Sequence, residues 1–284
     1  MENLKSKEKL WFYWEGEIPD YIKMCWNTAK ENVKSCDIVL VTPENVSNYI
    51  EKEDYELYCH MRNFNAKNDP GQRADFLRIC LLQKNGGIWA DSDIIFVKDV
   101  DLVLEKLKNY DLVVYEQPSL AKDSEEYYKS IKSTLEEDGR FLPENFHFIA
   151  QNFFASKKEG FCITKMREEA RKVVKNKPYL NNIRWGELGS EIFIEIVNKN
   201  MEKCFLYEEN KFVLFNWQNS ELFFQNLNFS LVEQIIEKNE QLCVMLYNHG
   251  FPDFFKKTPK KHLLQSDVLI AQLFKKYSNK NDLL

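Results

Sequence analysis

The sequence predicts an α/β fold in which helices flank a Rossmann-like sheet. Short apolar runs alternate with segments of helical spacing, and the first four elements follow in the order strand, helix, strand, helix. Of the 284 residues, 44% are hydrophobic and 14% aromatic, which is enough for a packed core. Because no internal repeat or low-complexity linker interrupts the chain, we expect a single domain over residues 1–284, with helical insertions.

The first apolar run, residues 10–14, predicts a buried strand. Apolar residues at helical spacing from Ile18 to Val33 predict an amphipathic helix, and residues 37–41 predict a second strand. Thr42 and Pro43 are expected to open the next helix, because proline is tolerated at a first helical position.

The segment from residue 69 to residue 97 is the most informative. Asp69, Pro70 and Gly71 are expected to open a helix that Gly86 and Gly87 end. A strand over residues 88–97 follows, interrupted by Asp91 and Asp93.

The second half of the chain predicts further strands and helices. Strands are expected at residues 111–115, 149–155 and 242–247, and residues 119–145 are expected to form a charged insertion over the sheet. Helices are expected at about 157–174, 189–200 and 261–277.

Charge and composition exclude several classes of protein. A net charge of -5 argues against a nucleic-acid-binding protein, which usually has a basic face. No run approaches the roughly 18 apolar residues of a spanning helix, so we expect a cytoplasmic protein, with a peripheral position at the inner membrane face left open. Seven scattered cysteines without a C-x-x-C pair predict reduced, buried thiols.

Asp91 and Asp93 are the strongest candidates for a functional site. Two carboxylates one residue apart repel each other, whereas a divalent cation between them reverses the repulsion. In a strand, residues i and i+2 point to the same side, so both side chains are expected to reach one ion. Oxygen ligands favour Mn²⁺ or Mg²⁺, which take further ligands from substrate phosphates. The pair therefore predicts a metal-bound diphosphate.

The residues around this pair resemble a known family. Ala74 to Arg78, Leu81-Leu82 and Gly86 to Asp93 are similar to the "DXD sugar-binding region" of glycosyltransferase family 32. That group includes Och1-like mannosyltransferases, capsular polysaccharide transferases and relatives of the large clostridial glucosylating toxins. The resemblance implies a GT-A type fold with a mixed sheet, and transfer of a sugar from a nucleotide sugar, a UDP-sugar foremost. It further implies retention at the anomeric carbon by front-side attack, in capsular or surface polysaccharide synthesis.

The resemblance also implies roles for single residues. Asp75 and Arg78 would bind donor-sugar hydroxyls, with Ser92 also in the donor site and Asn152 beside the sugar. A late histidine, His249, would complete the cation shell after Asp91 and Asp93; its neighbour Asn248 is the alternative. Nucleotide and metal would bind to residues 1–115, and the acceptor to residues 116–284.

Other residues keep two interpretations. The aromatic rings of Trp11, Phe12 and Trp14 would stack on a nucleotide base or pack in the core. Trp185 and Trp217 would line an acceptor cleft, although core packing is favoured for both.

Four positions near the expected site are polar or charged. Arg73 is expected to be solvated or bound to Asp69, and Gln151 or Glu191 to lie near the sugar without either being named as a base.

A basic cluster near the C-terminus is expected to be a solvated face, with contact to anionic lipid as the alternative. It consists of Lys256, Lys257, Lys260 and Lys261.

Two other functions also fit an Asp-x-Asp sequence. A haloacid-dehalogenase-type phosphohydrolase places such a pair after an apolar strand, but normally near the N-terminus. A module that binds a sugar nucleotide without turnover would retain the fold alone. The donor sugar, the base, the acceptor and the oligomeric state are not determined by the sequence.

Overall fold

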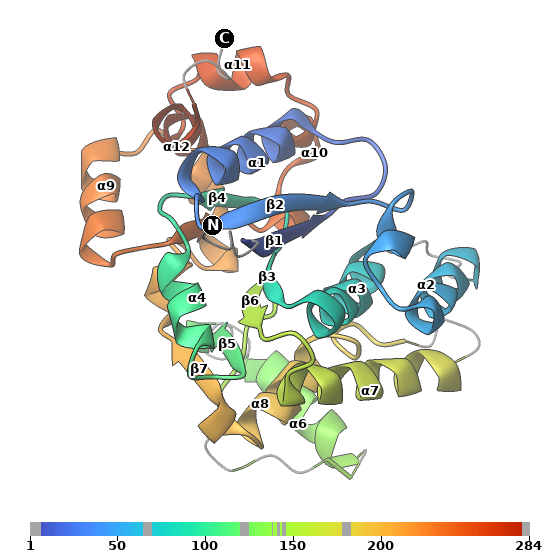
Figure 1. Ribbon diagram of the computed structural model, residues 1–284. Helices are drawn as coiled ribbons and strands as arrows, with labels where there is room; N and C mark the ends of the chain where they lie inside the picture. The colour runs from blue at the N-terminus through green and yellow to red at the C-terminus, as the bar shows by residue number, and fades with distance from the viewer. Residues whose placement is uncertain are drawn as a thin grey trace, which may run out of the picture.

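The computed structural model describes residues 7–64, 70–119, 125–137, 139–140, 143, 146–177 and 183–279. Six strands form a mixed sheet in the order β2-β1-β3-β6-β5-β7 (Figure 1). They are β1 (Glu8–Tyr13), β2 (Cys36–Val41), β3 (Gly87–Ala90), β5 (Leu112–Tyr115), β6 (Phe153–Ser156) and β7 (Cys204–Tyr207). β1 is parallel to β2 and β3, whereas β6 is antiparallel to β3 and β5. The mixed α/β sheet expected from the sequence is confirmed.

A second sheet contains two antiparallel strands, β4 (Ile94–Phe96) and β8 (Cys243–Met245). The helices between and after the strands are α1 (Asp20–Asn32), α2 (Lys52–Phe64), α3 (Pro70–Asn85), α4 (Asp101–Leu107), α6 (Glu125–Glu137), α7 (Phe161–Asn176), α8 (Ser190–Asn198), α9 (Phe229–Lys238), α10 (Asp253–Lys256), α11 (Lys260–Gln265) and α12 (Leu269–Tyr277). Within the described residues, none of the helices combines the length and the apolar character needed to cross a bilayer.

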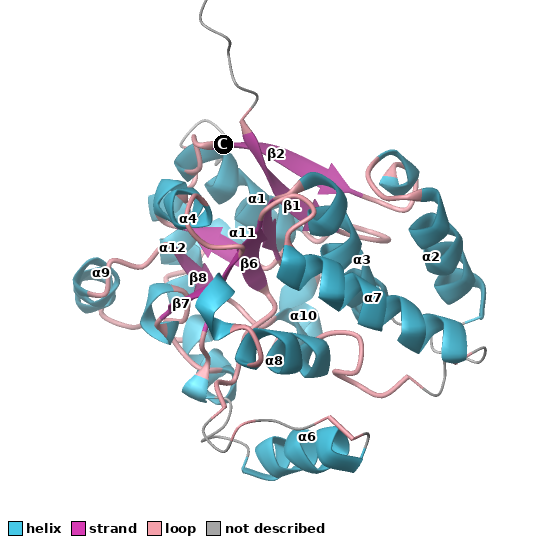
Figure 2. Cartoon of the chain, turned by 60° about the horizontal axis from the view of Figure 1, so that its bottom comes forward, coloured by secondary structure: helices cyan, strands magenta, loops and turns pink. Residues whose placement is uncertain are grey.

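The large sheet separates two hydrophobic clusters, which explains why the central strands β3 and β5 are apolar and buried along their whole length. Leu10 and Phe12 of β1 pack into the cluster that α1 and α12 cover, while Trp11 packs into the cluster beneath α3 and α7. Figure 1 shows α1 and α12 on one side of the sheet and α3 and α7 on the other. α6 lies beyond α8 at the lower end of the molecule (Figures 1 and 2). The expected insertion at 119–145 falls partly outside the described residues.

Two helix expectations are wrong. No helix opens at Pro43, because the Asn45 side chain accepts a hydrogen bond from the Thr42 N–H (2.8 Å) and donates one to the Leu40 carbonyl (3.0 Å). These bonds stabilise a turn followed by a 3₁₀ helix at Val46–Asn48. The expected helix over 261–277 is two helices, because Ser266 is extended (φ -80°, ψ 158°) and its hydroxyl binds the Leu263 carbonyl.

The helices α2, α4, α9 and α10 were not expected from the sequence. The cysteines meet their expectation, since all seven are free thiols and six are buried, with Cys59 partly exposed.

Candidate active site

Asp91, Ser92 and Asp93 lie at the carboxyl end of β3, where the chain leaves the large sheet for the small one. They form a turn, so the expectation of one strand through residues 88–97 is wrong. The Asp91 N–H donates to the Asn152 carbonyl (2.8 Å), and the Leu246 N–H donates to the Asp93 carbonyl (3.1 Å). The turn is therefore bonded to both sheets, and this, not strand alternation, positions the two carboxylates.

Ser92 anchors the turn to the end of β1. Its hydroxyl donates to the Tyr13 carbonyl (2.9 Å), and the residue is 6% exposed. The hydroxyl is therefore held by the protein itself. A contact with the donor, as expected from the sequence, would have to displace this bond.

The two carboxylates are partly buried and lie close enough to interact. The Asp91 side chain is 30% exposed and accepts a hydrogen bond from the Trp89 indole (2.8 Å). Asp93 accepts one from the Asn248 N–H (2.6 Å). Burial raises the pKa of Asp91, while Arg78 opposes the rise. Burial and then the charge of Asp91 raise the pKa of Asp93 to about 6.

Arg78 connects the helix α3 to this turn. Its guanidinium lies 3.0 Å from an Asp75 carboxylate oxygen and 3.3 Å from one of Asp91. It also donates to the Gln151 carbonyl (2.7 Å) and lies over the Trp89 ring, 5.2 Å from the centroid. Because the Arg78 side chain is only 5% exposed, this is an enclosed cluster and not a helix-surface ion pair.

Asn152 and Gln151 border the cluster from the start of β6. The Asn152 side chain accepts a hydrogen bond from the Tyr115 hydroxyl (2.6 Å). The Gln151 amide donates weakly to the Ser190 hydroxyl (3.4 Å), and its oxygen is buried without a hydrogen-bond partner among the described residues. A side chain at Gly189 would overlap this amide, so the glycine makes room for Gln151.

His249 and Asn248 lie in the short 3₁₀ helix Asn248–Gly250 after β8. His249 is exposed. Asn248 contacts Asp93 through its N–H, and its side chain accepts a hydrogen bond from the Tyr21 hydroxyl. In the described part of the chain, no three His, Cys, Asp or Glu residues gather as a metal-binding group. The structure thus brings Asn248 to the carboxylate pair more directly than His249.

The carboxylate pair fits a divalent cation. Asp91 retains one oxygen, Oδ2, for which the described residues offer no hydrogen-bond partner. Two carboxylates share this turn with one arginine, and a hard cation with oxygen ligands would balance the remaining negative charge.

The aromatic residues of β1 divide between core and surface. Trp11 is 0% and Phe12 is 1% exposed, and the Trp11 indole donates to the Gly86 carbonyl (2.9 Å). A base cannot stack on an enclosed ring, so that expectation is wrong for these two residues. Trp14 lies at the end of the strand, packs against Trp26 and is partly exposed. Of the three aromatic residues, it alone has exposed ring surface on which a base could stack.

Arg73 differs from its expectation. It is 1% exposed and binds both carboxylate oxygens of Glu15 at 2.6 and 3.0 Å, whereas Asp69 lies outside the described residues. Glu15 also accepts from the Tyr13 hydroxyl, which lies 3.0 Å from that of Tyr58. This buried group fixes the start of α3 against the end of β1. The sequence pattern did not predict this group, and Glu15 directly after an apolar strand was its one signal.

Trp185 and Trp217 are not core residues, because they are 72% and 46% exposed.

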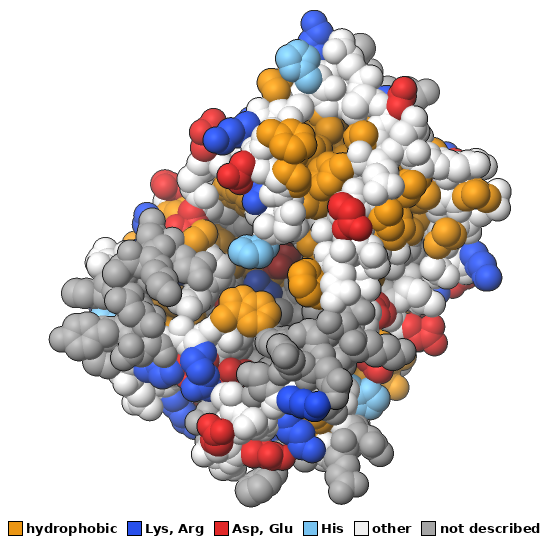
Figure 3. Space-filling model, turned by 180° about the vertical axis from the view of Figure 1, so that it is seen from behind, with side chains coloured by type: hydrophobic (Ala, Val, Ile, Leu, Met, Phe, Trp, Pro, Cys, Tyr) orange, Lys and Arg blue, Asp and Glu red, His pale blue; other side chains and the backbone are white. Residues whose placement is uncertain are grey.

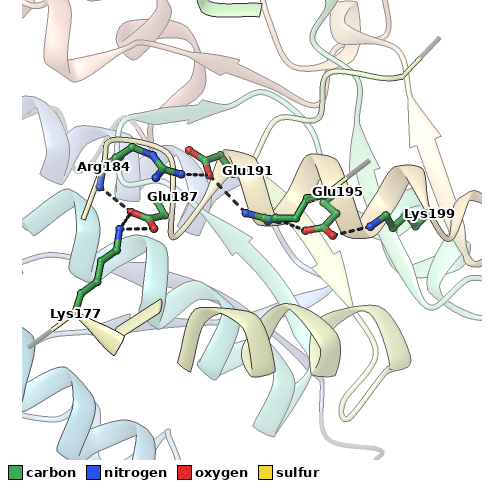
Figure 4. A network of polar contacts seen from close by, with 7 residues as sticks. Lys177, Arg184, Glu187, Glu191, Glu195 and Lys199 are labelled. Atoms are coloured by element: carbon green, nitrogen blue, oxygen red, sulfur yellow. Dashed lines mark hydrogen bonds and ion pairs between the residues drawn. The ribbon is translucent and has the colours of Figure 1, made fainter. Parts of the chain in front are cut away.

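The Glu191 carboxylate forms ion pairs with Arg184 at 3.1 Å and with Arg140 at 3.6 Å. Figure 4 shows it within a chain of charges along α8. That chain consists of Lys177, Glu187, Arg184, Glu191, Arg140, Glu195 and Lys199, with Glu187 joined to Arg184 through the Arg184 backbone N–H. Such pairing argues for a structural role of Glu191 rather than a role as a base.

Sequence comparison decides the family. The model of a family described as capsular polysaccharide synthesis protein matches residues 1–263. The chain belongs to this family. The group that the sequence resembles includes capsular polysaccharide transferases, and the family match confirms this part of the resemblance. No curated protein sequence is similar enough to this member of the capsular polysaccharide synthesis family to count as a relative.

Solved structures show which fold this family member has. The bifunctional glycosyltransferase WbbM matches with a TM-score of 0.59 and 10% identity, over 100% of this chain and 52% of that chain. Mouse xyloside xylosyltransferase 1 matches with a TM-score of 0.50 and 10% identity, over 87% of this chain and 100% of that chain. The PaToxG glycosyltransferase has 16% identity over 69% of this chain and 70% of that chain, with a TM-score of 0.42.

The chain spans about half the length of WbbM, and at these identities the likeness concerns the fold. The GT-A type fold expected from the sequence is confirmed. Family and fold both support the expected enzyme class, a glycosyltransferase.

Proposed function

We propose that this protein transfers a hexosyl group from a UDP-sugar to a saccharide acceptor in capsular or surface polysaccharide synthesis, with the help of Mn²⁺ or Mg²⁺. One observation carries the proposal: two carboxylates held by a hydrogen-bonded turn meet at the carboxyl end of β3, beside an enclosed arginine. Ligands in open α/β sheets bind at this end of the strands.

Asp91 and Asp93 would hold the cation, with Asn248 or His249 as the nearby contributors from the end of β8. When bound, the cation neutralises the charge that develops on the departing diphosphate. The chain itself supplies the rigid turn that keeps both carboxylates in place. This rigidity matters because groups fixed before the reaction need no reorganisation during it.

The donor sugar would lie against Asp75, Arg78 and Asn152. Arg78 is held by Asp75, Asp91 and the Gln151 carbonyl, so its charge has a fixed place beside the proposed donor sugar. In the transfer, the bond between the anomeric carbon and the diphosphate breaks with its electrons on the phosphate oxygen. The acceptor oxygen bonds to that carbon on the face from which the phosphate departs, and its proton passes to the leaving phosphate. Attack on this same face retains the anomeric configuration.

Gln151 fits a position beside the reacting carbon. Its side-chain oxygen is buried without a hydrogen-bond partner among the described residues, next to the arginine that holds its carbonyl. Such an oxygen stabilises the positive character of a sugar as the bond to phosphate breaks. We propose this amide as a positioning and electrostatic group, in place of the base that no carboxylate provides.

The two halves of the chain are expected to have different roles in binding. We propose that residues 1–115 bind nucleotide and metal, and that residues 116–284 shape the acceptor side. Figure 3 shows a face with a hollow in which acidic and basic side chains lie beside a histidine, with hydrophobic side chains gathered above it. A face of this mixed character suits a saccharide, which offers both hydroxyls and apolar ring faces.

The test is turnover of the donor by the purified full chain. We expect hydrolysis of a UDP-sugar that needs Mn²⁺ and is abolished in Asp93→Ala, while Asp37→Ala, a change at an exposed aspartate of β2, keeps full activity. Screening UDP- and GDP-sugars by thermal shift with Mn²⁺ identifies the donor. Hydrolysis of simple phosphate esters without any activity on sugar nucleotides would favour a phosphohydrolase instead. Binding without turnover in the presence of acceptors would favour an inactive module.

A further inference from the structure

A lysine-rich cleft lies at the end of the sheet opposite to Asp91 and Asp93. Its volume is about 560 Å³, and six lysines line it: Lys7, Lys9, Lys84, Lys108, Lys157 and Lys158. The register shows where it lies: Gly87 at the start of β3 pairs with Ser156 at the end of β6, whereas Ala90 pairs with Phe153 at the other end. The cleft is therefore a feature separate from the carboxylate pair.

The lysines come from four segments, and the two glycines before and in β3 let two of these segments, at Lys9 and Lys158, approach closely. Gly86 and Gly87 have positive φ values of 73° and 96°. A Cβ at Gly86 would lie 2.8 Å from the Lys158 nitrogen, and one at Gly87 would overlap the Lys9 carbonyl. Only glycine permits both the conformation and the close approach. The approach of Lys9 and Lys158 to the start of β3 is thus built into the sheet.

Little negative charge compensates these side chains. Among the described residues, only Lys84 has a carboxylate partner, Glu51 at 3.5 Å. Lys7 donates to the Lys34 carbonyl, and Lys157 to the Lys108 carbonyl.

The other negative charges at the cleft are few. Glu8 is the one acidic residue of its lining. The C-termini of α3 and α4, which lie at the cleft, add about half a negative charge each. An excess of about three positive charges is left, in a chain whose net charge is -5.

We propose that this cleft binds a small polyphosphorylated anion, of the size of a diphosphate or nucleoside diphosphate. Ammonium groups bind phosphate as point charges, and several of them around one cleft match the several charges of a polyphosphate. Positively charged side chains reach the cleft from both faces of the sheet. Lys84 comes from the end of α3, and Lys108 comes from the end of α4. This arrangement favours a compact anion over an extended polymer.

The experiment is calorimetric titration of the full chain with inorganic pyrophosphate in EDTA, so that no divalent cation is present. We expect saturable binding in the wild type and in Asp93→Asn, with an affinity that falls as salt rises. Lys108→Gln combined with Lys158→Gln, at two exposed side chains, is expected to weaken binding tenfold or more. The matched control, Lys165→Gln with Lys172→Gln on α7, changes the net charge equally and is expected to change the affinity less than twofold.

Several results would overturn the proposal. The proposal is wrong if the wild type does not bind pyrophosphate saturably, or if Asp93→Asn no longer binds it. It is also wrong if the Lys108/Lys158 variant and the Lys165/Lys172 variant lose pyrophosphate affinity equally. Sedimentation with phosphatidylglycerol vesicles separates the two sources of phosphate. If the Lys108/Lys158 pair governs vesicle binding while pyrophosphate does not bind, the cleft is a membrane contact and the proposal is wrong.

Discussion

Arg78 contacts four residues at the candidate site. It joins Asp75, Asp91 and the Gln151 carbonyl, and it packs on Trp89. A lysine at this position has one ammonium and cannot reach three acceptors in a plane. The identity of this residue therefore matters more than its charge.

For Arg78→Lys we expect kcat to fall about 100-fold, which corresponds to about 2.7 kcal/mol of transition-state stabilisation. Steady-state kinetics with a UDP-sugar measure it. Arg62→Lys, a change at an exposed arginine of α2, serves as control and should leave kcat within twofold. Equal kcat values for the wild type and Arg78→Lys would show that the contacts of the guanidinium are not used in catalysis.

Asp93 provides a second prediction at this scale. A ligand that binds only the folded state stabilises it in proportion to the logarithm of its concentration over Kd. We expect Mn²⁺ with UDP to raise the melting temperature of the wild type by several degrees, about 2–4 °C per kcal/mol for a chain of this size. In Asp93→Asn the rise should be under 1 °C. A full rise in this variant would mean that Asp93 holds no cation.

At the scale of the element, the turn from α3 into β3 depends on two glycines. Gly87 has φ +96° and no room for a Cβ beside Lys9, whereas Gly16 has φ +80° and open space around it. A comparison of the two separates backbone strain from steric overlap.

We expect Gly16→Ala to lower the free energy of unfolding by about 1 kcal/mol, from strain alone. Gly87→Ala should lower it by about 3 kcal/mol or more, because β1 and β3 must move apart. Urea unfolding followed by circular dichroism measures both. Similar losses in the two variants would contradict the close approach.

The charges along α8 predict opposite pH dependences for two glutamates. Burial raises the pKa of Glu191, and its arginines only partly oppose this. Burial acts the same way on Glu195, but the hydrogen bond from Lys199 and the charge of Arg140 bring its pKa below the ordinary value. A lowered pKa stabilises the fold above the unfolded pKa, and that stability is lost as the pH falls through the folded pKa.

Glu195→Gln is therefore expected to cost about 1 kcal/mol at pH 7, with a difference from wild type that shrinks below about pH 4. For Glu191 the sign is reversed: its folded pKa is raised, so the wild type loses stability relative to Glu191→Gln as the pH rises above about 4.3. Urea unfolding across pH 3–8 checks both slopes. Parallel slopes would show that the two side chains share one environment.

At the scale of the whole molecule, the sequence predicted β1, α1, β2 and α3 because their patterns are local, but it missed α2. Each of the predicted elements has its own spacing of apolar residues and its own residues that mark where it begins or ends. The turn at Asp91 to Asp93 was predicted as strand, because residues 94–96 are as apolar as β3. Only the pairing of β4 with β8, about 150 residues away, shows that the chain changes sheets.

The candidate site was predictable to the extent that it lies in one stretch of chain. Asp75, Arg78 and Asp91 stand together in sequence and in space. Contacts across long separations were missed, among them Glu15 with Arg73 and Tyr115 with Asn152. Trp11 and Phe12 were ambiguous because an aromatic run looks the same whether both sheet faces are covered or one is open. The burial of β1 resolves that ambiguity.

The central claim is that Asp91 and Asp93 share one cation with a nucleotide diphosphate. Diffraction from crystals grown with UDP and Mn²⁺, recorded at a wavelength where manganese scatters anomalously, tests it most directly. We predict one strong anomalous peak with carboxylate oxygens of both residues and phosphate oxygens of UDP within about 2.3 Å. UDP bound elsewhere, or bound at this turn with no metal between the two carboxylates, would contradict the claim.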